Sequence, residues 1–492
     1  MRHELQKILN AYCSCLIPQS SQLQDMQIKN PRTGEYDYEI FPLTNQELKE
    51  KAEAMRNAQI AWKENGIEFR IKALQSWKDV VEEHKDELIE ALCTDTGRKW
   101  ETVLEADLVA SSIDRWSKIS REFFAQTVRK TSSIPFLEIE QDLEPYPLVG
   151  VISPWNFPLL LSLIDTIPAL LAGSTVIVKP SEVTPRFIKV IEKTIEQVPE
   201  LQDVLCYVEG GGETGAELSK LTDLICFTGS TATGRMVYQA ASDNFIPVFL
   251  ELGGKDAVIV TESADIERAT SAILWGSVAN AGQSCLSIER IYVNRNIYHQ
   301  FLSRLVGKAN LLNLAFPTMD SGQIGPIISE KQVQIMDEQL KDAVQKGAKI
   351  VAGSTQCEEK DGGFYCRPTV LTNVSHKMKI MTEETFGPIL PVMPFTTNEE
   401  AIELANGTQY GLSGAVFAGT EEEAMEIARK MKCGAVSIND AALTAIMHEG
   451  EKNSFKMSGI GGTRMGASAI KRFMKQKAYL INSQGVNAPW WF

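Results

Sequence analysis

Short apolar runs rich in β-branched residues alternate with helical stretches from about residue 146 onward. The runs that decide the fold are Val149-Gly-Val-Ile152, Thr175-Val-Ile-Val178, Val204-Leu-Cys-Tyr-Val208 and Leu224-Ile-Cys-Phe227. Continuous apolar runs of this length are typical of strands that are buried on both faces of a sheet. Because helical stretches separate them, they predict βαβ units and a parallel sheet.

A second series of strand-like runs follows a break near residue 250. These runs are Ala257-Val-Ile-Val260, Ile288-Glu-Arg-Ile-Tyr-Val293, Lys349-Ile-Val351, Ile389-Leu-Pro-Val392 and Gly414-Ala-Val-Phe417. A helical segment from Asp265 separates the first two of them. We therefore predict an α/β fold with two successive Rossmann-like parallel sheets.

The pattern of apolar and polar residues at the two ends of the chain differs from that in the middle. The first third is predicted to be helical, because apolar residues from Leu48 to Trp62 recur at helical spacing behind Asn45-Gln46-Glu47, and Ile71 to Leu92 repeats the pattern. The tail from Lys475 to Phe492 is strand-like and then apolar. Such a tail either covers its own domain or docks on a second subunit.

Length and composition exclude several classes of protein. The 492 residues correspond to three domains at about 150 residues each. The net charge of −14 disfavours non-specific binding to nucleic acid or to an anionic membrane. The longest apolar run, residues 157–173, is too short and too broken to span a bilayer. We therefore expect neither nucleic acid nor a membrane among the partners.

Cysteine and histidine usage indicates the compartment and disfavours a metal site. The nine cysteines show no disulfide framework, and the first residues lack the unbroken apolar stretch of a signal peptide, so we expect a cytoplasmic protein. None of the five histidines has the i, i+3 or i+4 spacing of a helical metal site, so no metal is expected.

Two glycine-bearing loops are candidates for binding a phosphate group. Gly210-Gly-Gly212-Glu-Thr-Gly215 has the dinucleotide-binding spacing but lacks an acidic residue about 20 positions further on. It is either a phosphate turn or a tight turn into a helix at Ala216. The better placed loop is Thr228-Gly-Ser-Thr-Ala-Thr-Gly234, which joins a strand to a helix. Free N–H groups and the helix dipole favour an anion at such a helix N-terminus.

Three further positions are candidates for chemistry. Lys179-Pro-Ser-Glu182 lies at the carboxyl end of a strand, where it either grips ribose hydroxyls or forms a surface turn. Cys285 follows the polar, glycine-bearing stretch Asn280-Ala-Gly-Gln-Ser, and a lowered pKa would make its thiol a nucleophile, whereas a buried cysteine is usually inert. Glu251 lies in an apolar strand end, where burial would raise its pKa toward that of a general base.

These pieces occur together and in the same order in one family. From about Asn30 to Leu480, the chain resembles the NAD(P)-dependent aldehyde dehydrogenases. The matching blocks are Pro154-Trp-Asn-Phe-Pro158, Lys179-Pro-Ser-Glu182, Phe227-Thr-Gly-Ser-Thr231 with Gly234, Leu250-Glu-Leu-Gly-Gly-Lys255, Gly282-Gln-Ser-Cys285 and Glu383-Glu-Thr-Phe-Gly-Pro388. Agreement of six ordered blocks by chance is negligible.

The resemblance implies a role for each matching residue. Cys285 would attack the aldehyde carbonyl to give a thiohemiacetal, which hydride loss converts to a thioester. Asn156 and the backbone N–H of Cys285 would stabilise the oxyanion, and Glu251 would activate the water that releases the carboxylic acid. The residues expected to bind the cofactor are Lys179 and Glu182 at the adenosine ribose, Trp155, Gly229, Ser230 and Gly234 near the pyrophosphate, and Glu384 and Phe386 at the nicotinamide ribose.

Two of these residues refine the expected reaction. Glu251 favours a hydrolytic enzyme over relatives that lack this acid and pass the acyl group to coenzyme A. Glu182 favours NAD over NADP, because a carboxylate accepts hydrogen bonds from the 2′-hydroxyl and repels a 2′-phosphate. Use of NADP stays possible.

The sequence departs from the family near the C-terminus. Members carry a Pro-Phe-Gly-Gly block before Lys-x-Ser-Gly, whereas here Glu451-Lys-Asn-Ser-Phe455 precedes Lys456-Met-Ser-Gly459, and the insert-like Ala442-Leu-Thr-Ala-Ile-Met-His448 lies before both. Residues 159–164 and Leu286 are apolar. We expect an apolar aliphatic or aromatic aldehyde as substrate.

The resemblance also implies a domain organisation. A cofactor domain would comprise residues 1–120 and 146–250, and a catalytic domain residues 251–433. Residues 121–145 and 470–492 would form a small β oligomerisation element, and residues 434–469 a segment at the substrate entrance. A homodimer or homotetramer is expected. The alternative is a catalytically silent cofactor-binding or structural protein of the same fold, which would not need Cys285, Glu251 or Asn156.

Overall fold

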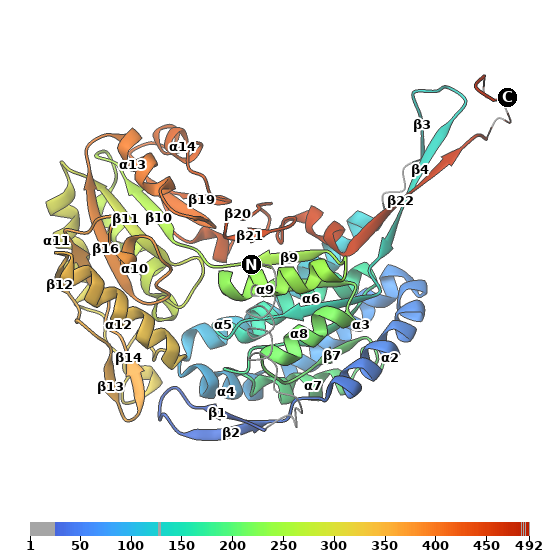
Figure 1. Cartoon of the computed structure of the whole chain (residues 1–492), viewed down its shortest axis with the longest axis horizontal. Coiled ribbons are helices and arrows are strands. Elements are labelled where there is room, and N and C mark those ends of the chain that lie inside the picture. Colours follow the sequence, from blue (N-terminus) through green and yellow to red (C-terminus); the bar gives the residue numbers. More distant parts are fainter. Residues whose placement is uncertain (1–24, 126–128, 484, 486, 488, 492) are drawn as a thin grey trace, which may run out of the picture.

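The computed structural model describes residues 25–125, 129–483, 485, 487 and 489–491. Two large sheets, each flanked by helices, form the body of the molecule, and a small third sheet projects from it (Figure 1). The predicted α/β class with two successive sheets and a small β element is confirmed. Cys13 and Cys15 lie outside the described residues.

The first large sheet has the strand order β21-β9-β8-β5-β6-β7. Its strands are β5 (Leu148–Ile152), β6 (Thr175–Lys179), β7 (Leu205–Tyr207), β8 (Leu224–Thr228), β9 (Val248–Glu251) and β21 (Gly459–Ile460). The helices of this half are α2 (Asn45–Glu64), α3 (Gly66–Glu83), α4 (Lys85–Thr96), α5 (Trp100–Phe124), α6 (Pro158–Ala172), α7 (Phe187–Glu196), α8 (Gly212–Leu221) and α9 (Thr231–Asp243). Every residue of β5, β6 and β8 is buried, as expected for strands covered on both faces.

Local sequence explains where several of these helices begin and end. Thr44 and Glu47 form a capping box at the start of α2, one residue before the predicted start. His84 has non-helical backbone angles, so the stretch predicted as one helical pattern forms two helices, α3 and α4. Helix α8 begins at Gly212 rather than at Ala216, because the N-terminal turn continues directly from the glycine loop.

The second large sheet has the strand order β12-β15-β16-β11-β10-β18-β19. Its strands are β10 (Asp256–Val260), β11 (Ile288–Asn294), β12 (Lys349–Ala352), β15 (Thr369–Thr372), β16 (Ile389–Phe395), β18 (Ser413–Phe417) and β19 (Ala435–Ile438). The accompanying helices are α10 (Ile266–Val278), α11 (Tyr298–Ala309), α12 (Glu330–Gln345), α13 (Asn398–Asn406) and α14 (Glu421–Ala428). The sheet thus continues past residue 433, which the sequence predicts as the end of this domain.

Each large sheet departs from the predicted parallel arrangement at one edge. Strand β21 pairs antiparallel with β9, and β12 pairs antiparallel with β15. An edge strand has only one neighbour, so its direction is less constrained than that of a central strand, and mixed sheets of this kind are common.

The third sheet has the order β22-β4-β3 and joins two distant parts of the chain. Strand β22 (Met474–Ile481) pairs antiparallel along its whole length with β4 (Glu138–Pro145), which also pairs with β3 (Arg129–Thr131). Beyond β22, the Trp490 ring stacks on Phe136 with centroids 6.2 Å apart, so part of the apolar tail contacts the connection between β3 and β4.

Smaller elements connect these units. They are the strand pairs β1 (Met26–Lys29) with β2 (Tyr36–Ile40), β13 (Glu358–Lys360) with β14 (Gly363–Tyr365) and β17 (Tyr410–Gly411) with β20 (Phe455–Lys456), and the short helices η1 (Ala279–Gly282), η2 (Met319–Ser321), η3 (Lys379–Met381), η4 (Leu443–Ala445) and η5 (Ala467–Phe473). Among the described residues, no helix combines the length and the apolar character needed to cross a membrane.

Candidate active site

Cys285, Asn156 and Glu251 come together although they lie in three distant parts of the sequence. Asn156 follows β5, Glu251 ends β9, and Cys285 follows η1. All three line a cavity of about 120 Å³, here named the strand-end cavity because the carboxyl ends of β5, β8 and β9 form much of its wall. Cys285 and Asn156 also line a second cavity of about 170 Å³, here named the apolar channel. Cys285 therefore stands where the two cavities meet.

The loop that carries Cys285 has an unusual backbone. Asn280, Ala281 and Gly282 have φ values of 54°, 52° and 72°. A non-glycine residue in this region costs free energy and persists only when its surroundings fix it. The surroundings do so here, because the Asn280 N–H donates to Glu101 Oε1 at 2.8 Å and its side-chain Nδ2 donates to the Asn156 carbonyl at 3.0 Å. At Gly282, an added Cβ would lie 2.3 Å from the carbonyl carbon of Gly387.

The Asn156 side chain is buried and oriented by the same loop. Its Nδ2 atom donates to the Gln283 carbonyl at 3.0 Å, and the residue is only 3% exposed. An amide nitrogen carries two hydrogens, so one stays available for a further acceptor. This arrangement fits the predicted donor to an oxyanion formed next to Cys285.

The electrostatic environment of Cys285 differs from the sequence expectation. Burial, with a smaller contribution from the nearby Glu251 carboxylate, raises the pKa of the Cys285 thiol to about 12, and Lys452 opposes this rise. A lowered pKa, which would have marked the nucleophile, is therefore absent in the protein without cofactor. The thiol is protonated at neutral pH, so its attack on a carbonyl requires a base to remove the proton.

Glu251 has a charged partner that the sequence reasoning missed. Lys452 Nζ lies 3.1 Å from Glu251 Oε1, and both side chains are largely buried, at 8% and 19% exposure. Lys452 belongs to the stretch Glu451-Lys-Asn-Ser-Phe455, where this chain departs from the pattern of its relatives. This departure from the family pattern was the only signal in the sequence for the ion pair, because nothing in the sequence links positions 201 residues apart.

The predicted nicotinamide-ribose residues lie in a rigid loop before β16. Glu384 Oε1 accepts a hydrogen bond from the Gly254 N–H at 3.0 Å, and the Phe386 ring meets Trp155 edge-on with centroids 5.3 Å apart. Burial raises the pKa of the Glu384 carboxyl to about 8, with the Glu289 charge adding to the effect. Glu289 also accepts hydrogen bonds from the N–H groups of Thr385 and Phe386, so it fixes the loop. Sequence reasoning missed this role of Glu289.

The remaining predicted cofactor residues divide into two groups. Trp155, Gly229 and Ser230 line the strand-end cavity, and the Ser230 hydroxyl caps α9 by accepting from the Thr233 N–H. Gly234 lies outside the cavity wall, since an added Cβ there would instead meet the Leu252 side chain at 2.5 Å.

Lys179 and Glu182 lie further along the same sheet edge, where Lys179 ends β6 and Glu182 follows it. Their side chains pair with each other, with Lys179 Nζ 3.2 Å from Glu182 Oε2. Lys179 is almost fully buried, whereas Glu182 keeps part of its carboxylate exposed for a further hydrogen bond. In the adjacent Gly210–Gly215 stretch, Gly210 and Gly211 lead directly into α8, and a Cβ at Gly210 would lie 2.1 Å from Thr214 Oγ1.

The apolar channel brings together both segments that the sequence marked as substrate-facing. Residues of α5 and α6 form much of its wall, including Leu160, Leu161 and Ile164, and Leu286 follows the thiol. The insert-like stretch 442–448 closes another side through Ala442, Thr444, Ala445, Ile446 and His448. Among the described residues, no group of histidine, cysteine or acidic side chains is arranged to hold a metal ion.

Comparisons with known proteins agree with this site. A sequence model of the aldehyde dehydrogenase family matches residues 17–479. The chain is 35% identical over 460 residues to 4,4′-diapolycopene aldehyde oxidase of Methylomonas sp, covering 92% of this chain and 85% of that protein.

Two solved structures are similar over nearly the whole chain. The putative aldehyde dehydrogenase PutA from Anabaena variabilis superposes with a TM-score of 0.94 at 57% identity, covering 95% of this chain and 100% of that one. Betaine aldehyde dehydrogenase from Staphylococcus aureus, in complex with NAD+, gives a TM-score of 0.89 at 30% identity, covering 96% and 97%.

The chain belongs to the aldehyde dehydrogenase family. It is therefore an oxidoreductase that acts on aldehydes with NAD+ or NADP+ as the acceptor. The resemblance predicted from the sequence motifs is confirmed.

Proposed function

We propose that this protein oxidises an apolar aliphatic or aromatic aldehyde to its carboxylic acid, with NAD+ as hydride acceptor and Cys285 as nucleophile. The observation that carries the proposal is the position of the Cys285 thiol between the strand-end cavity and the largely apolar channel. A carbonyl group at the inner end of that channel would face the thiol, the Asn156 amide and the Glu251 carboxylate together.

The acylation half of the reaction uses the groups around the thiol. Glu251 takes the thiol proton as the Cys285 sulfur forms a bond to the carbonyl carbon. The carbonyl oxygen becomes an oxyanion, to which the free N–H of the Asn156 amide donates. Removing one such donor in other enzymes lowers kcat by about 10²–10³-fold. When bound, NAD+ accepts the hydride that leaves the tetrahedral carbon, and a thioester on Cys285 remains.

Hydrolysis of that thioester requires a base other than the sulfur. Glu251 first releases the proton of the acylation step to solvent. It then takes a proton from water as the water oxygen attacks the thioester carbon, the carbon–sulfur bond breaks, and this proton passes to the sulfur to give the acid and the thiol. Lys452 holds the Glu251 carboxylate through its 3.1 Å ion pair.

The cofactor residues fit a dinucleotide. The capped N-terminus of α9 presents Gly229 and Ser230 to the strand-end cavity, which suits a pyrophosphate. The Glu182 carboxylate next to Lys179 suits a ribose 2′-hydroxyl, which supports NAD+ over NADP+. A higher kcat/KM with NADP+ than with NAD+ in parallel assays would contradict this preference.

One assay tests the proposed reaction. NADH formation is followed by its absorbance with octanal, benzaldehyde and succinic semialdehyde, using Cys285→Ala and Cys93→Ala in parallel. We expect turnover of the two apolar aldehydes, loss of turnover in Cys285→Ala and normal rates in Cys93→Ala. Preference for succinic semialdehyde would overturn the substrate class, and activity of Cys285→Ala would overturn the mechanism.

We also propose that the protein is a homodimer or homotetramer and works in the cytoplasm. The projecting sheet supports the first point, because Leu480 on β22 is 79% exposed and each edge strand, β22 and β3, pairs with β4 alone among the described residues (Figure 1). The seven cysteines within the described residues are all free, which supports a reducing compartment. Light scattering after size exclusion tests the assembly, and a mass of one chain would contradict it.

A further inference from the structure

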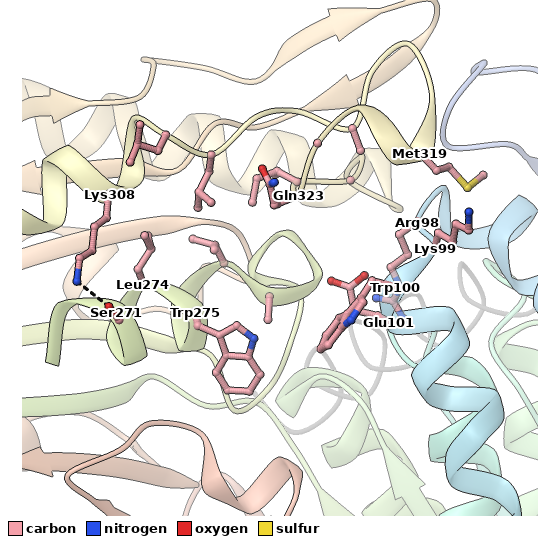
Figure 2. A pocket seen from close by; sticks show the side chains of 18 residues that line it. Arg98, Lys99, Trp100, Glu101, Ser271, Leu274, Trp275, Lys308, Met319 and Gln323 are labelled. Atoms are coloured by element: carbon pink, nitrogen blue, oxygen red, sulfur yellow. Dashed lines mark hydrogen bonds between the residues drawn. The ribbon is translucent and has the colours of Figure 1, made fainter. Parts of the chain in front are cut away.

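A third and larger cavity, of about 670 Å³, lies beside the apolar channel and is here named the distal cavity (Figure 2). It lies between the start of α5, helices α10 and α11, and the segment 311–325. None of the predicted catalytic or cofactor residues lines it. Its volume is about four times the 170 Å³ of the channel that reaches Cys285.

The distal cavity and the apolar channel share a wall. Trp100, Glu101, Trp275 and Ala279 line both. Figure 2 shows the two tryptophan rings in this wall, one from α5 and one from α10, with Glu101 next to Trp100. The rings are 61% and 41% exposed. A molecule that extends outward from Cys285 along the channel would therefore reach the distal cavity at these rings.

The chemistry of the distal cavity suits a hydrocarbon. Leu274, Val278, Leu311, Leu312 and Ile324 contribute apolar side chains. Leu311 is 75% exposed, so a large apolar side chain at this site is left facing solvent. Apolar surface that lines a concave site and lacks cover is typical of ligand-binding sites.

The cationic side chains in this wall are ion-paired, although Arg98 Nε and Nη1 have no hydrogen-bond partner within the part of the chain that the structure describes. Lys308 Nζ lies 2.7 Å from Glu267. It also donates a hydrogen bond to Ser271 Oγ at 2.6 Å, which is the dashed line in Figure 2. Lys99 lies 3.0 Å from Asp320. The buried Arg98 donates to Glu105 at 2.8 Å, and its guanidinium lies over the Phe157 ring. With these cations neutralised, the cavity does not favour a phosphate or carboxylate.

We propose that the distal cavity is a second subsite that binds the far hydrocarbon end of a long-chain aldehyde whose carbonyl lies at Cys285. This inference rests on the proposed oxidation of apolar aldehydes and specifies their length. A short aldehyde fills the channel alone, whereas a long one also passes Trp100 and Trp275 and covers Leu311. Each buried methylene group contributes to binding, so kcat/KM rises with chain length.

The test compares butanal, octanal and dodecanal with the wild-type enzyme and two cavity variants. Leu311→Asp makes the wall polar, and Ser271→Trp fills the cavity from an exposed position on α10. Val344→Asp is the matched control, because Val344 is exposed on α12 and lines neither cavity. We expect the two cavity variants to lower kcat/KM for dodecanal by at least about tenfold, as loss of a few buried methylene contacts predicts. Rates with butanal should stay unchanged.

A binding measurement tests the distal cavity without relying on turnover. Calorimetry with 1-decanol, an unreactive analogue, should give at least about tenfold weaker binding to Leu311→Asp than to wild type and to Val344→Asp. Equal binding to all three, or no binding to wild type, would overturn the subsite. If octanal and butanal are oxidised but the cavity variants treat dodecanal as wild type does, the subsite is wrong and the proposed function stands. If no aldehyde is oxidised, the proposed function fails, and the calorimetry decides the subsite alone.

Discussion

The strand-end cavity and the apolar channel share Asn156, Leu161 and Cys285 but are built in different ways. The strand-end cavity is formed by loops at the carboxyl ends of parallel strands, and backbone hydrogen bonds such as that from Gly254 to Glu384 hold these loops. The channel is formed by side chains on the faces of α5, α6 and α10 together with the stretch 442–448. A fixed backbone suits the chemistry common to a family, whereas side chains on helix faces can change with the substrate.

The largest expected effect concerns the strand-end cavity, whose backbone is fixed. Asn156→Ala should lower kcat by about 10²–10³-fold with little change in KM, because the amide acts only on the oxyanion of the transition state. Steady-state kinetics with octanal measure this effect. Asn244→Ala, at the exposed end of α9, is the control and should behave as wild type. An equal rise of KM with unchanged kcat would show that Asn156 only binds substrate.

The next effect tests the environment of the thiol. Because the pKa of Cys285 is raised to about 12, the thiolate fraction should rise about tenfold per pH unit, or about 100-fold between pH 7 and pH 9. Iodoacetamide labelling of the cofactor-free enzyme, followed by mass spectrometry of the Cys285 peptide, measures this slope. A labelling rate that levels off below pH 8 would mean that the folded protein lowers the pKa of this thiol.

A smaller effect is expected at Lys452, which comes from the C-terminal stretch that differs from the family pattern and which pairs with Glu251 in the strand-end cavity. Lys452→Met should lower kcat by about tenfold, because Glu251 loses the cation that holds its carboxylate in place. The pKa of Cys285 should rise as well, since Lys452 lowers it, so iodoacetamide labelling should slow.

Two further variants separate this positioning role from a structural one. Lys452→Arg keeps the charge and should recover most of the rate, and Lys49→Met, on the exposed face of α2, should have no effect. If Lys452→Met lowers thermal stability but leaves the rate and the labelling of Cys285 unchanged, Lys452 only stabilises the fold.

The same contrast explains what the sequence could predict. Strands such as β5 and β10 are apolar throughout because both of their faces are buried, so short windows identify them. The residues of the strand-end cavity follow these strands directly, which is why motifs could locate Asn156, Glu251 and Ser230.

Other features depend on contacts that no window contains. The ion pair between Lys452 and Glu251 joins residues 201 positions apart, and the raised pKa of Cys285 results from burial by several segments. The break between α3 and α4 depends on the backbone angles of His84, which the local amino-acid sequence does not specify. The distal cavity likewise arises only when α5 packs near α10 and α11.

Direct detection of the acyl-enzyme tests the central claim, that Cys285 carries the substrate between the two cavities. Wild-type enzyme is mixed with octanal and NAD+, quenched with acid within one turnover and digested, and the peptides are analysed by mass spectrometry. We predict an octanoyl group on the Cys285 peptide, formed together with NADH, because the hydride leaves before water attacks the thioester. NADH formation without an acyl group on Cys285, or with the acyl group on another cysteine, would contradict the account.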